Sequence, residues 1–536
     1  MKRINKIVFV PSIIILGGAA ILGLVDGERF GEISHGAFSF ILSSFGWLFQ
    51  IAVMASVFVV LFLFISKGKI RFGGKNAKPK FSFMSWFAMS LTGGIATGLV
   101  LYGVNEPIVY VGNVYGEMSH YGIATGTTES AIFAMGRVFY NWTFLPYATY
   151  ALAGALMAYL YFNKGTKLAV SETLRPIVGK LADNNYFNSI VNTLSLLAIA
   201  LGLASSLGGG LTFVGSAIEF KYGISQGYVL WGVIAAVITI IFTFASYKGV
   251  EKGIKILADF NTRMYFLILL ILFIVGPTIY MLSLSSTGMG YWLDNFFSWG
   301  LDSGNVFSAK EMTAGLDASL GGDALVQWWT LYDWAMWIAY APLMSIFLAM
   351  IAYGRTIREF LIVNWILPAT FGVVWFTIWG ATAIYWQNTG EVDLVSVINE
   401  GGALAAMWAF VDNINIAGFN IGMIIIPIMI ICLIVSFATA ADAMTTSIAT
   451  LCSKDLKQGE EPSSFLKIIW GVIIGAIAFV LVASVGGDQG VDGVKYMAAV
   501  GGGFVLIIFL VQIISAIKTF FMEELTEPEE PLMHNE

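Results

Sequence analysis

Long apolar segments separated by short polar loops run through most of the chain. Stretches such as FVPSIIILGGAAILGLV and IAVMASVFVVLFLFI carry no charged residue, and several runs approach the roughly 18 to 20 apolar residues that a bilayer-crossing helix needs. Helices buried in a large soluble core are the alternative, but such a core would not need so many runs of this length. The pattern therefore predicts an all-α polytopic membrane protein. Its twelve transmembrane helices are expected at 8–25, 47–66, 84–104, 138–162, 187–207, 228–246, 263–283, 326–351, 360–386, 418–448, 465–485 and 497–520.

The distribution of basic residues supports this count and sets an orientation. If both termini face the cytoplasm, 23 of the 28 Lys and Arg residues fall on the cytoplasmic side. Lys and Arg are retained on that side of short loops, so we predict cytoplasmic N and C termini. The opposite side keeps only Arg29, Arg137, Lys221, Lys310 and Lys495.

Composition agrees with a membrane protein and excludes several functions. The chain is 58% hydrophobic and 12% charged, about half the charge of an average soluble domain. Two cysteines suggest no disulfide framework. No basic patch with interleaved aromatic residues supports nucleic-acid binding. The sequence EELTEPEEPLMHNE, residues 523–536, predicts a short, disordered acidic tail.

The third span is rich in glycine. Gly93, Gly94 and Gly98 fall in its middle, and each glycine weakens a helix by about 1 kcal/mol relative to alanine. The glycines could simply allow close helix packing. They could also unwind the helix locally, which is tolerated at membrane depth where the backbone lines a cavity or is buried in protein.

The eighth span is interrupted as well, because Pro342 follows its aromatic sequence QWWTLYDWAMWIAYAP. Spans three and eight are five apart, so a repeated five-helix unit would appear in inverted orientation. Paired interrupted helices in an inverted repeat point to a transporter substrate site near the bilayer midplane. The expected divisions are 1–83 with the first two spans, 84–283 and 326–520 as the two repeats, 284–325 as an extracellular connection with an amphipathic helix, and 521–536 as the acidic tail.

Aromatic residues gather on the eighth and fourth spans. Trp334 and Trp337 are three residues apart and are expected on one helical face. In span four, NWTFLPYATY places Trp142, Tyr147 and Tyr150 close together. Aromatic residues are also enriched at membrane interfaces. A cluster of ring faces is nevertheless suited to a methylated ammonium group, because such a group cannot donate hydrogen bonds and is held by cation–π attraction.

These residues carry a resemblance to the betaine/carnitine/choline transporter family. Its signature resembles WTLYDWAMWIAYAP at 329–342, followed by GRTIREF at 354–360. Two further elements stand as YGVNEP at 102–107 and VGPT at 275–278. The resemblance extends in order over nearly the whole chain.

The resemblance implies a LeuT-like fold with a 5+5 inverted repeat in spans 3–12, a homotrimer in the inner membrane of a bacterium, and a quaternary or methylated ammonium substrate such as betaine, carnitine, choline or a smaller methylamine. The family's central aromatic box carries over onto Trp142, Tyr147, Tyr150 and Trp337. Together with neighbouring positions of spans three and eight, the expected substrate-binding residues are Trp142, Tyr147, Tyr150, Trp337, Trp334, Met336, Asp333, Tyr340, Trp329, Gly94, Ile95, Ala96 and Gly98.

Three of these positions depart from the family pattern. Met336 stands where the family often has tryptophan, and its polarizable side chain would reshape the pocket. Asp333 stands where an aromatic residue is usual; it either faces the pathway or a partner, or lies near the outer surface. Gly98 replaces the aspartate of the proton-coupled choline carriers, which disfavours that mode of transport.

The coupling ion is left open between two alternatives. Thr439 is kept in span ten and Ser206 in span five, but Ala440 stands where serine is expected, and Ile199 and Leu203 replace the family's sodium-site threonines. Arg263 lies close to where sodium-independent exchangers carry an arginine; it could equally be an ordinary cytoplasmic-end arginine that snorkels. The chain is therefore either Na⁺-coupled through one altered site or an ion-independent exchanger, and no cofactor besides Na⁺ is expected.

Other function classes have less support. A LeuT-fold transporter of another small substrate, such as an amino acid, is the main alternative. A membrane-embedded enzyme would need a catalytic constellation, but the three histidines form no ligand pair and no nucleophile elbow occurs. The run Gly208–Gly210 lacks the strand context and lysine of a phosphate-binding loop, so an ATP-driven pump is unsupported.

Overall fold

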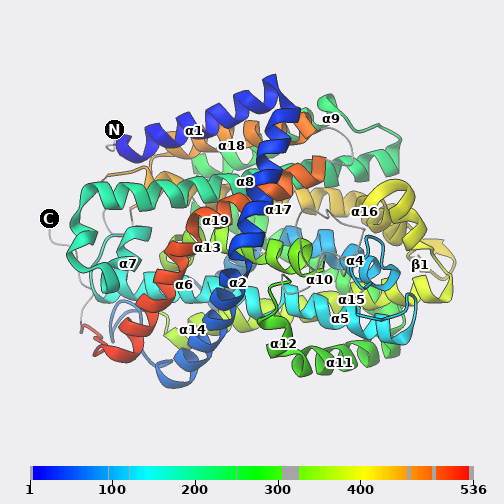
Figure 1. Cartoon of the computed structure of the whole chain (residues 1–536), viewed down its shortest axis with the longest axis horizontal. Coiled ribbons are helices and arrows are strands. Elements are labelled where there is room, and N and C mark those ends of the chain that lie inside the picture. The colour runs from blue at the N-terminus through cyan, green and yellow to red at the C-terminus, as the bar shows by residue number, and fades with distance from the viewer. Residues whose placement is uncertain are drawn as a thin grey trace.

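The structure is a computed structural model that describes residues 4–94, 96–119, 121–248, 250–304, 325–454, 460–485 and 490–529. Nearly all of this part of the chain is helical (Figure 1). Its first half holds α1 Lys6–Val25, α2 Gly27–Ser66, α3 Phe83–Gly94, α4 Ala96–Gly112, α5 Thr128–Trp142, α6 Phe144–Asn163, α7 Val170–Val178, η1 Gly179–Asp183, α8 Asn185–Tyr222, α9 Tyr228–Lys248, α10 Val250–Val275, α11 Thr278–Asp294 and α12 Phe296–Gly300. Its second half holds η3 Val326–Leu331, α13 Tyr332–Met350, α14 Ile357–Leu361, η4 Ile362–Ile366, α15 Leu367–Thr389, α16 Leu394–Asp412, β1 Asn415–Ile416, β2 Phe419–Asn420, α17 Gly422–Leu451, α18 Ser464–Val485, α19 Gly490–Ile517 and η6 Lys518–Met522.

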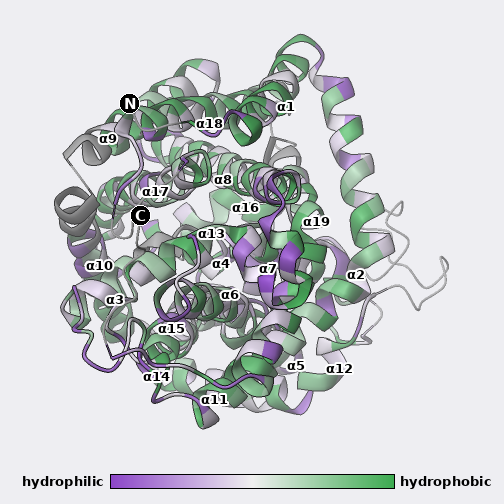
Figure 2. Cartoon of the chain, turned by 90° about the vertical axis from the view of Figure 1, so that its left-hand side faces the viewer, coloured by the Kyte–Doolittle hydropathy of each residue, from purple (hydrophilic) through white to green (hydrophobic). Residues whose placement is uncertain are grey.

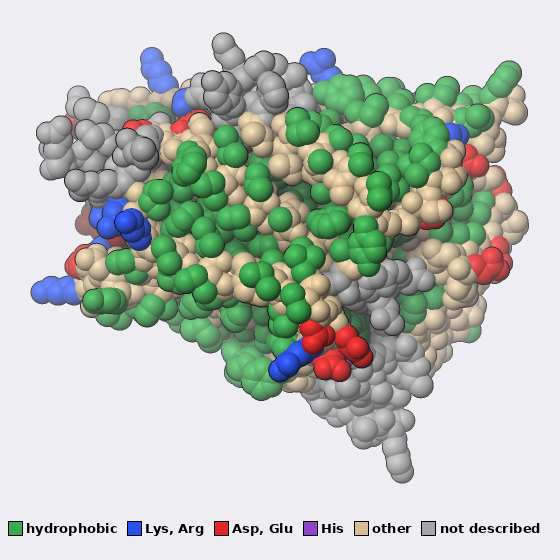
Figure 3. All heavy atoms as spheres, turned by 90° about the horizontal axis from the view of Figure 1, so that it is seen from above, with side chains coloured by type: hydrophobic (Ala, Val, Ile, Leu, Met, Phe, Trp, Pro, Cys, Tyr) green, Lys and Arg blue, Asp and Glu red, His purple; other side chains and the backbone are tan. Residues whose placement is uncertain are grey.

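The long apolar helices confirm a polytopic all-α membrane protein. Within the described residues, nine helices are long and apolar enough to cross a membrane, or eleven if each of two bent pairs is one span. The prediction of twelve spans is therefore not established. Apolar side chains cover much of the outer surface (Figure 3), and large ones such as Ile14 and Phe62 are more than half exposed. Such a surface is suited to lipid.

Three predicted spans are broken or bent. Span three holds α3 and α4, and residue 95 between them lies outside the described residues. Span four consists of α5 and α6, separated by Thr143, whose φ of −120° and ψ of −115° are not helical. Span eight opens with the π-helical turn η3 and bends by 47° after Pro342. Proline removes a backbone hydrogen-bond donor, and π-helical turns are frequent at functional sites.

The third break corrects the prediction for span seven, which was expected to run to residue 283. α10 ends at Val275, and α11 turns away from it by 106° across Gly276 and Pro277. The apolar pattern continues across this corner, so hydropathy alone could not place it. A second difference is α16, a helix interrupted at Gly402 (φ 79°) that precedes the predicted tenth span.

Helix α13 lies in the interior of the molecule. Figure 2 shows it near the middle, with α1 and α2 at the periphery. It packs against α6, α8 and α19, and its described side chains are buried except for the half-buried Met336 and Met350. A helix that is apolar on all sides is normally enclosed by other helices. Close packing with α19 depends on Gly502, because a Cβ there would meet the Ala335 carbonyl at 2.1 Å.

Both chain ends lie at the same end of the molecule (Figure 1), and the start of the acidic tail is not disordered as predicted. Backbone bonds join residues 68–72 to residues 354–358. The tail docks on the first of these loops, since Arg71 N donates to Glu527 Oε1 at 2.7 Å and Lys75 N to Pro528 O at 3.1 Å. Asn163 adds a bond to the Thr526 carbonyl at 3.1 Å. Residues 530–536 lie outside the described part.

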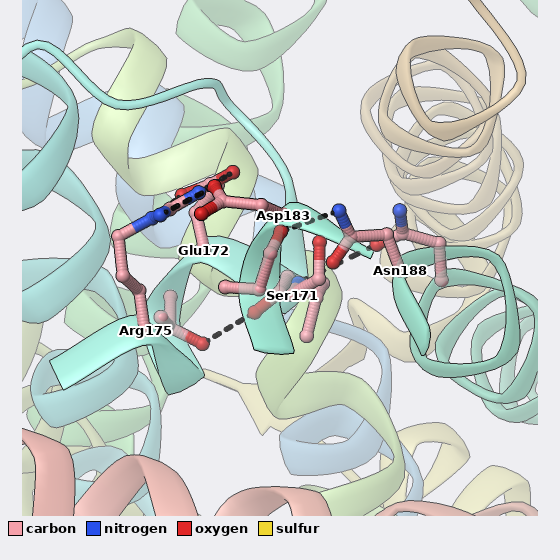
Figure 4. Close-up of polar contacts among 9 residues, drawn as sticks. Ser171, Glu172, Arg175, Asp183 and Asn188 are labelled. Atoms are coloured by element: carbon pink, nitrogen blue, oxygen red, sulfur yellow. Dashed lines mark hydrogen bonds and ion pairs between the residues drawn. The ribbon is translucent and has the colours of Figure 1, made fainter. Parts of the chain in front are cut away.

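The loop between α6 and α8 is held by an ionic cluster. Arg175 donates to both carboxylate oxygens of Glu172, at 2.6 and 3.1 Å, and to Asp183 at 2.8 Å (Figure 4). Asn188 of α8 donates to the Ala182 carbonyl at 2.7 Å. These bonds fix α7 against the start of α8.

Candidate functional site

Four aromatic residues from three helices meet in the interior. The Trp337 ring of α13 lies 4.8 Å from the Tyr147 ring, 4.7 Å from the Tyr150 ring and 6.4 Å from the Trp142 ring, centroid to centroid. All four are buried, with exposed fractions of 1 to 6%. The break at Thr143 lets Trp142 end α5 while Tyr147 and Tyr150 follow one another along α6. The structure thus brings together the four residues predicted for the box, and we call them the aromatic group.

Trp142 is held in place by span three. Tyr102 of α4 stacks on its ring with centroids 5.1 Å apart. Glu106, also on α4, accepts a hydrogen bond from its indole Nε1 at 2.5 Å. Gly98 lies against the other part of the ring, because a Cβ at this position would approach the Trp142 Cζ3 atom to 2.8 Å. Helix α4 therefore fixes both the position and the tilt of the Trp142 ring.

Glu106 is a functional candidate that the sequence reasoning did not single out. It is fully buried, and besides Trp142 it accepts bonds from the Tyr110 hydroxyl at 2.7 Å and the Asn141 amide at 2.8 Å. Asn141 Oδ1 accepts from Thr330 at 3.1 Å. The available signal was an isolated carboxylate inside an apolar span, in the sequence YGVNEP.

A methyl group at Gly98 is expected to disturb the aromatic group without unfolding the protein. In the Gly98→Ala variant the new Cβ would displace the Trp142 ring, so we expect the KM for the transported substrate to rise about tenfold or more, the effect of weakening one cation–π contact. Uptake kinetics measure this change. The control is Gly209→Ala, because nothing lies within 4 Å of a Cβ at Gly209. Equal KM values for the two variants would contradict the contact.

The N-terminal part of span eight carries Trp329 and Asp333. Trp329 packs on the rings of Tyr102 and Tyr110, with centroids 6.1 and 5.4 Å apart, and its Nε1 donates to Glu117 at 3.2 Å. Asp333 is 1% exposed, so its carboxylate is enclosed by protein and is not presented to solvent at the outer surface. It lies within electrostatic range of the Tyr110 hydroxyl.

Two other predicted residues of span eight, Trp334 and Met336, make different contacts. Trp334 was expected on the same face as Trp337, but its Nε1 donates to Gln50 of α2 at 2.8 Å and its ring packs on Tyr140. Met336 accepts a bond from the Tyr332 hydroxyl at 3.7 Å. The helix periodicity of 100° per residue explains the separation, because a three-residue step turns Trp334 away by about 60°.

Tyr340 links span eight to span five. Its hydroxyl donates to the Gly202 carbonyl of α8 at 2.5 Å, and Ser206, one turn further along α8, also bonds this hydroxyl. Ser206, predicted as a coupling residue, therefore faces Tyr340.

The remaining coupling candidates are dispersed. The Thr439 hydroxyl donates to the Val435 carbonyl of its own helix at 2.8 Å, and Ala440 is half-buried. The Arg263 side chain is exposed, the placement expected of an arginine at a span end. Two residues before Arg263 on α10, the Asn261 side-chain amide donates to the Ser436 hydroxyl of the neighbouring helix α17 at 2.5 Å. The backbones of Gly94 and Ala96 flank residue 95, and Ile95 itself lies outside the described residues.

Known proteins resemble this chain in sequence over almost all of its length. The sequence matches the family described as "BCCT, betaine/carnitine/choline family transporter" over residues 7–525. It is 28% identical to the glycine betaine transporter OpuD of Bacillus subtilis (strain 168), over 97% of this chain and 95% of the relative. It is 28% identical to the ectoine/hydroxyectoine transporter of Virgibacillus pantothenticus, over 95% and 96%. Glycine betaine transporter 1 of Vibrio parahaemolyticus is 30% identical over 89% and 87%. The chain therefore belongs to the betaine/carnitine/choline transporter family, whose members are transporters and not enzymes.

Proposed function

We propose that this protein is a secondary active transporter of a quaternary or methylated ammonium compound and that the aromatic group binds the ammonium head. The observation that carries the proposal is the meeting of the Trp142, Tyr147, Tyr150 and Trp337 rings, which come from α5, α6 and α13. Glycine betaine, which appears in the names of two of the relatives, carries a quaternary ammonium head.

The chemistry of the four side chains favours a cation without N–H donors. Ring faces carry negative electrostatic potential and attract an ammonium group at about 6 Å or less. Among the described residues, the Trp337 indole N–H and the Tyr147 hydroxyl have no hydrogen-bond partner although both are buried. No acidic side chain is therefore directly bonded to this part of the group, and methyl groups can approach it closely.

We further propose an arrangement of repeats, an oligomeric state and a membrane location that suit this function. Spans 3–12 form two inverted five-helix repeats that alternate access to the aromatic group from the two sides, and the protein is a homotrimer in the inner membrane of a bacterium with cytoplasmic termini. The shared location of the two chain ends and of the basic loop at residues 67–80 supports this orientation. Substrate transport is either coupled to Na⁺ or proceeds by exchange of one substrate molecule for another.

Uptake into proteoliposomes tests the proposal. The purified full-length protein is expected to take up labelled choline, glycine betaine or trimethylamine with saturable kinetics, measured with and without an inward Na⁺ gradient. Stimulation by the gradient would select Na⁺ coupling, whereas uptake that requires internal substrate would select exchange. Absence of saturable uptake of every quaternary and tertiary methylamine would contradict the proposed function.

A further inference from the structure

Glu106 is bonded directly to one ring of the aromatic group. The indole Nε1 of Trp142 donates to Glu106 Oε2 at 2.5 Å. The other carboxylate oxygen accepts from the Tyr110 hydroxyl at 2.7 Å and from the Asn141 amide at 2.8 Å. Indole and amide N–H groups can only donate, so the ionised carboxylate satisfies these bonds best. A fully buried negative charge therefore lies at the edge of the Trp142 ring.

A chain of hydrogen bonds holds this carboxylate and connects it to a buried guanidinium. Asn141, which donates to Glu106, accepts from the Thr330 hydroxyl of η3 at 3.1 Å. Thr330 in turn accepts from Arg137 at 2.6 Å. The Arg137 guanidinium is in electrostatic range of Glu106 and lies over the Trp299 ring at 4.7 Å. The negative end of this network therefore lies against the aromatic group, and its positive end lies two side chains away.

The two tryptophans of the aromatic group differ in their indole N–H partners. Among the described residues, the buried Trp337 N–H has no hydrogen-bond partner, whereas the Trp142 N–H is bonded to a carboxylate. Cation–π attraction is electrostatic, so negative charge at the ring edge adds to the negative potential over the ring face. The addition is large in the protein interior, where a low dielectric constant weakens screening. Of the two indoles, Trp142 should therefore attract an ammonium head more strongly.

We propose that Glu106 is a positioning residue that acts through Trp142 and sets the preference of the aromatic group for a cationic head over a neutral head of the same shape. This inference rests on the proposed function and adds the residue that selects for charge. A tert-butyl group has the shape of a trimethylammonium group, so both gain the same packing against the four rings. Only the ammonium group gains the attraction of the carboxylate behind Trp142.

Replacement of Glu106 by glutamine tests the proposal in the full-length protein. Binding of choline and of glycine betaine to the purified protein is measured by calorimetric titration, each beside its analogue with a tert-butyl group in place of trimethylammonium. We expect Glu106→Gln to weaken binding of the ammonium compounds about tenfold or more, the order that loss of one charge within about 8 Å produces in a partly desolvated site. Binding of the analogues should weaken less than about threefold.

Two controls accompany this measurement. Glu106→Asp keeps the negative charge and should retain most of the preference for the ammonium compounds. Glu400→Gln makes the same change as Glu106→Gln at an exposed carboxylate of α16 and should leave all binding constants unchanged.

A matched pair of substitutions tests the same point if Glu106→Gln does not fold. Trp142→Phe and Trp337→Phe both keep a ring and remove an indole N–H, but only the N–H at position 142 is bonded to a carboxylate among the described residues. We expect Trp142→Phe to reduce the preference for an ammonium compound over its tert-butyl analogue several-fold more than Trp337→Phe does. An equal or larger reduction by Trp337→Phe would overturn the inference.

Failure of the inference is distinguishable from failure of the proposed function. If Glu106→Gln weakens the ammonium compounds and their analogues equally, Glu106 has only a structural role, and the proposed function stands. If the unaltered protein takes up a methylated ammonium compound but binds its tert-butyl analogue as tightly, the selection for charge is absent and the inference is wrong. If the unaltered protein neither binds nor takes up any methylated ammonium compound, both fail together.

Discussion

Replacing Trp337 by leucine is expected to raise the KM for a methylated ammonium substrate by about thirtyfold or to abolish saturable uptake. Trp337 contacts all three other members of the aromatic group. Each desolvated cation–π contact contributes about 2 kcal/mol, and tenfold in affinity corresponds to about 1.4 kcal/mol. Leucine keeps the apolar character of the site but has no π face, so the loss should appear in substrate affinity. Uptake kinetics in proteoliposomes measure it.

The matched control is Trp47→Leu, which makes the same change on α2, where the Trp47 side chain is 51% exposed on the outer surface. This control should transport normally. Conservative replacement by phenylalanine or tyrosine at position 337 should retain much of the activity, since both keep a ring. Largely intact transport by Trp337→Leu would instead favour a carrier of another small substrate, such as an amino acid.

Replacing Glu106 by alanine is expected to be the most destabilising single change near the site. Three buried donors, the Tyr110 hydroxyl, the Asn141 amide and the Trp142 indole N–H, would lose their acceptor. Removing one partner from a buried charged network costs about 3 to 5 kcal/mol, and each unsatisfied group adds to the cost. We expect the apparent Tm of the detergent-purified protein to fall by several degrees and transport to be lost.

Two comparisons separate the network from a general effect of removing a carboxylate. Glu106→Gln keeps one acceptor oxygen and a similar volume, so its Tm should lie between those of the alanine variant and the unaltered protein. Glu400→Ala removes an exposed carboxylate from α16 and should leave Tm and uptake unchanged. A Glu106→Ala protein as stable as Glu400→Ala would show that Glu106 does not hold this part of the structure.

The sequence predicts the class of fold and the aromatic group well, because both depend on local patterns. Apolar runs of membrane length identify the helices, and the local spacing shows that Trp142, Tyr147 and Tyr150 lie close together in span four. The family resemblance supplied the pairing of these two spans, which periodicity alone leaves open.

Features that depend on three-dimensional packing could not be predicted. The corner at Gly276 and Pro277 lies in an apolar run that hydropathy reads as continuous. Trp334 belongs to a buried network with Gln50 and Tyr140, and only the position of α2 reveals that partner. The docking of Glu527 on the Arg71 backbone joins segments more than 400 residues apart in sequence, so composition suggested a free tail. Glu106 was overlooked because its three donors come from α4 and α5 together.

The most direct test of the central claim is a density map of the purified protein with choline bound. We predict the trimethylammonium group against the ring faces of Trp337, Tyr147, Tyr150 and Trp142, within about 6 Å of their centroids. Density for the ammonium group at any other place in the protein, with these four rings packed only on one another, would contradict the account.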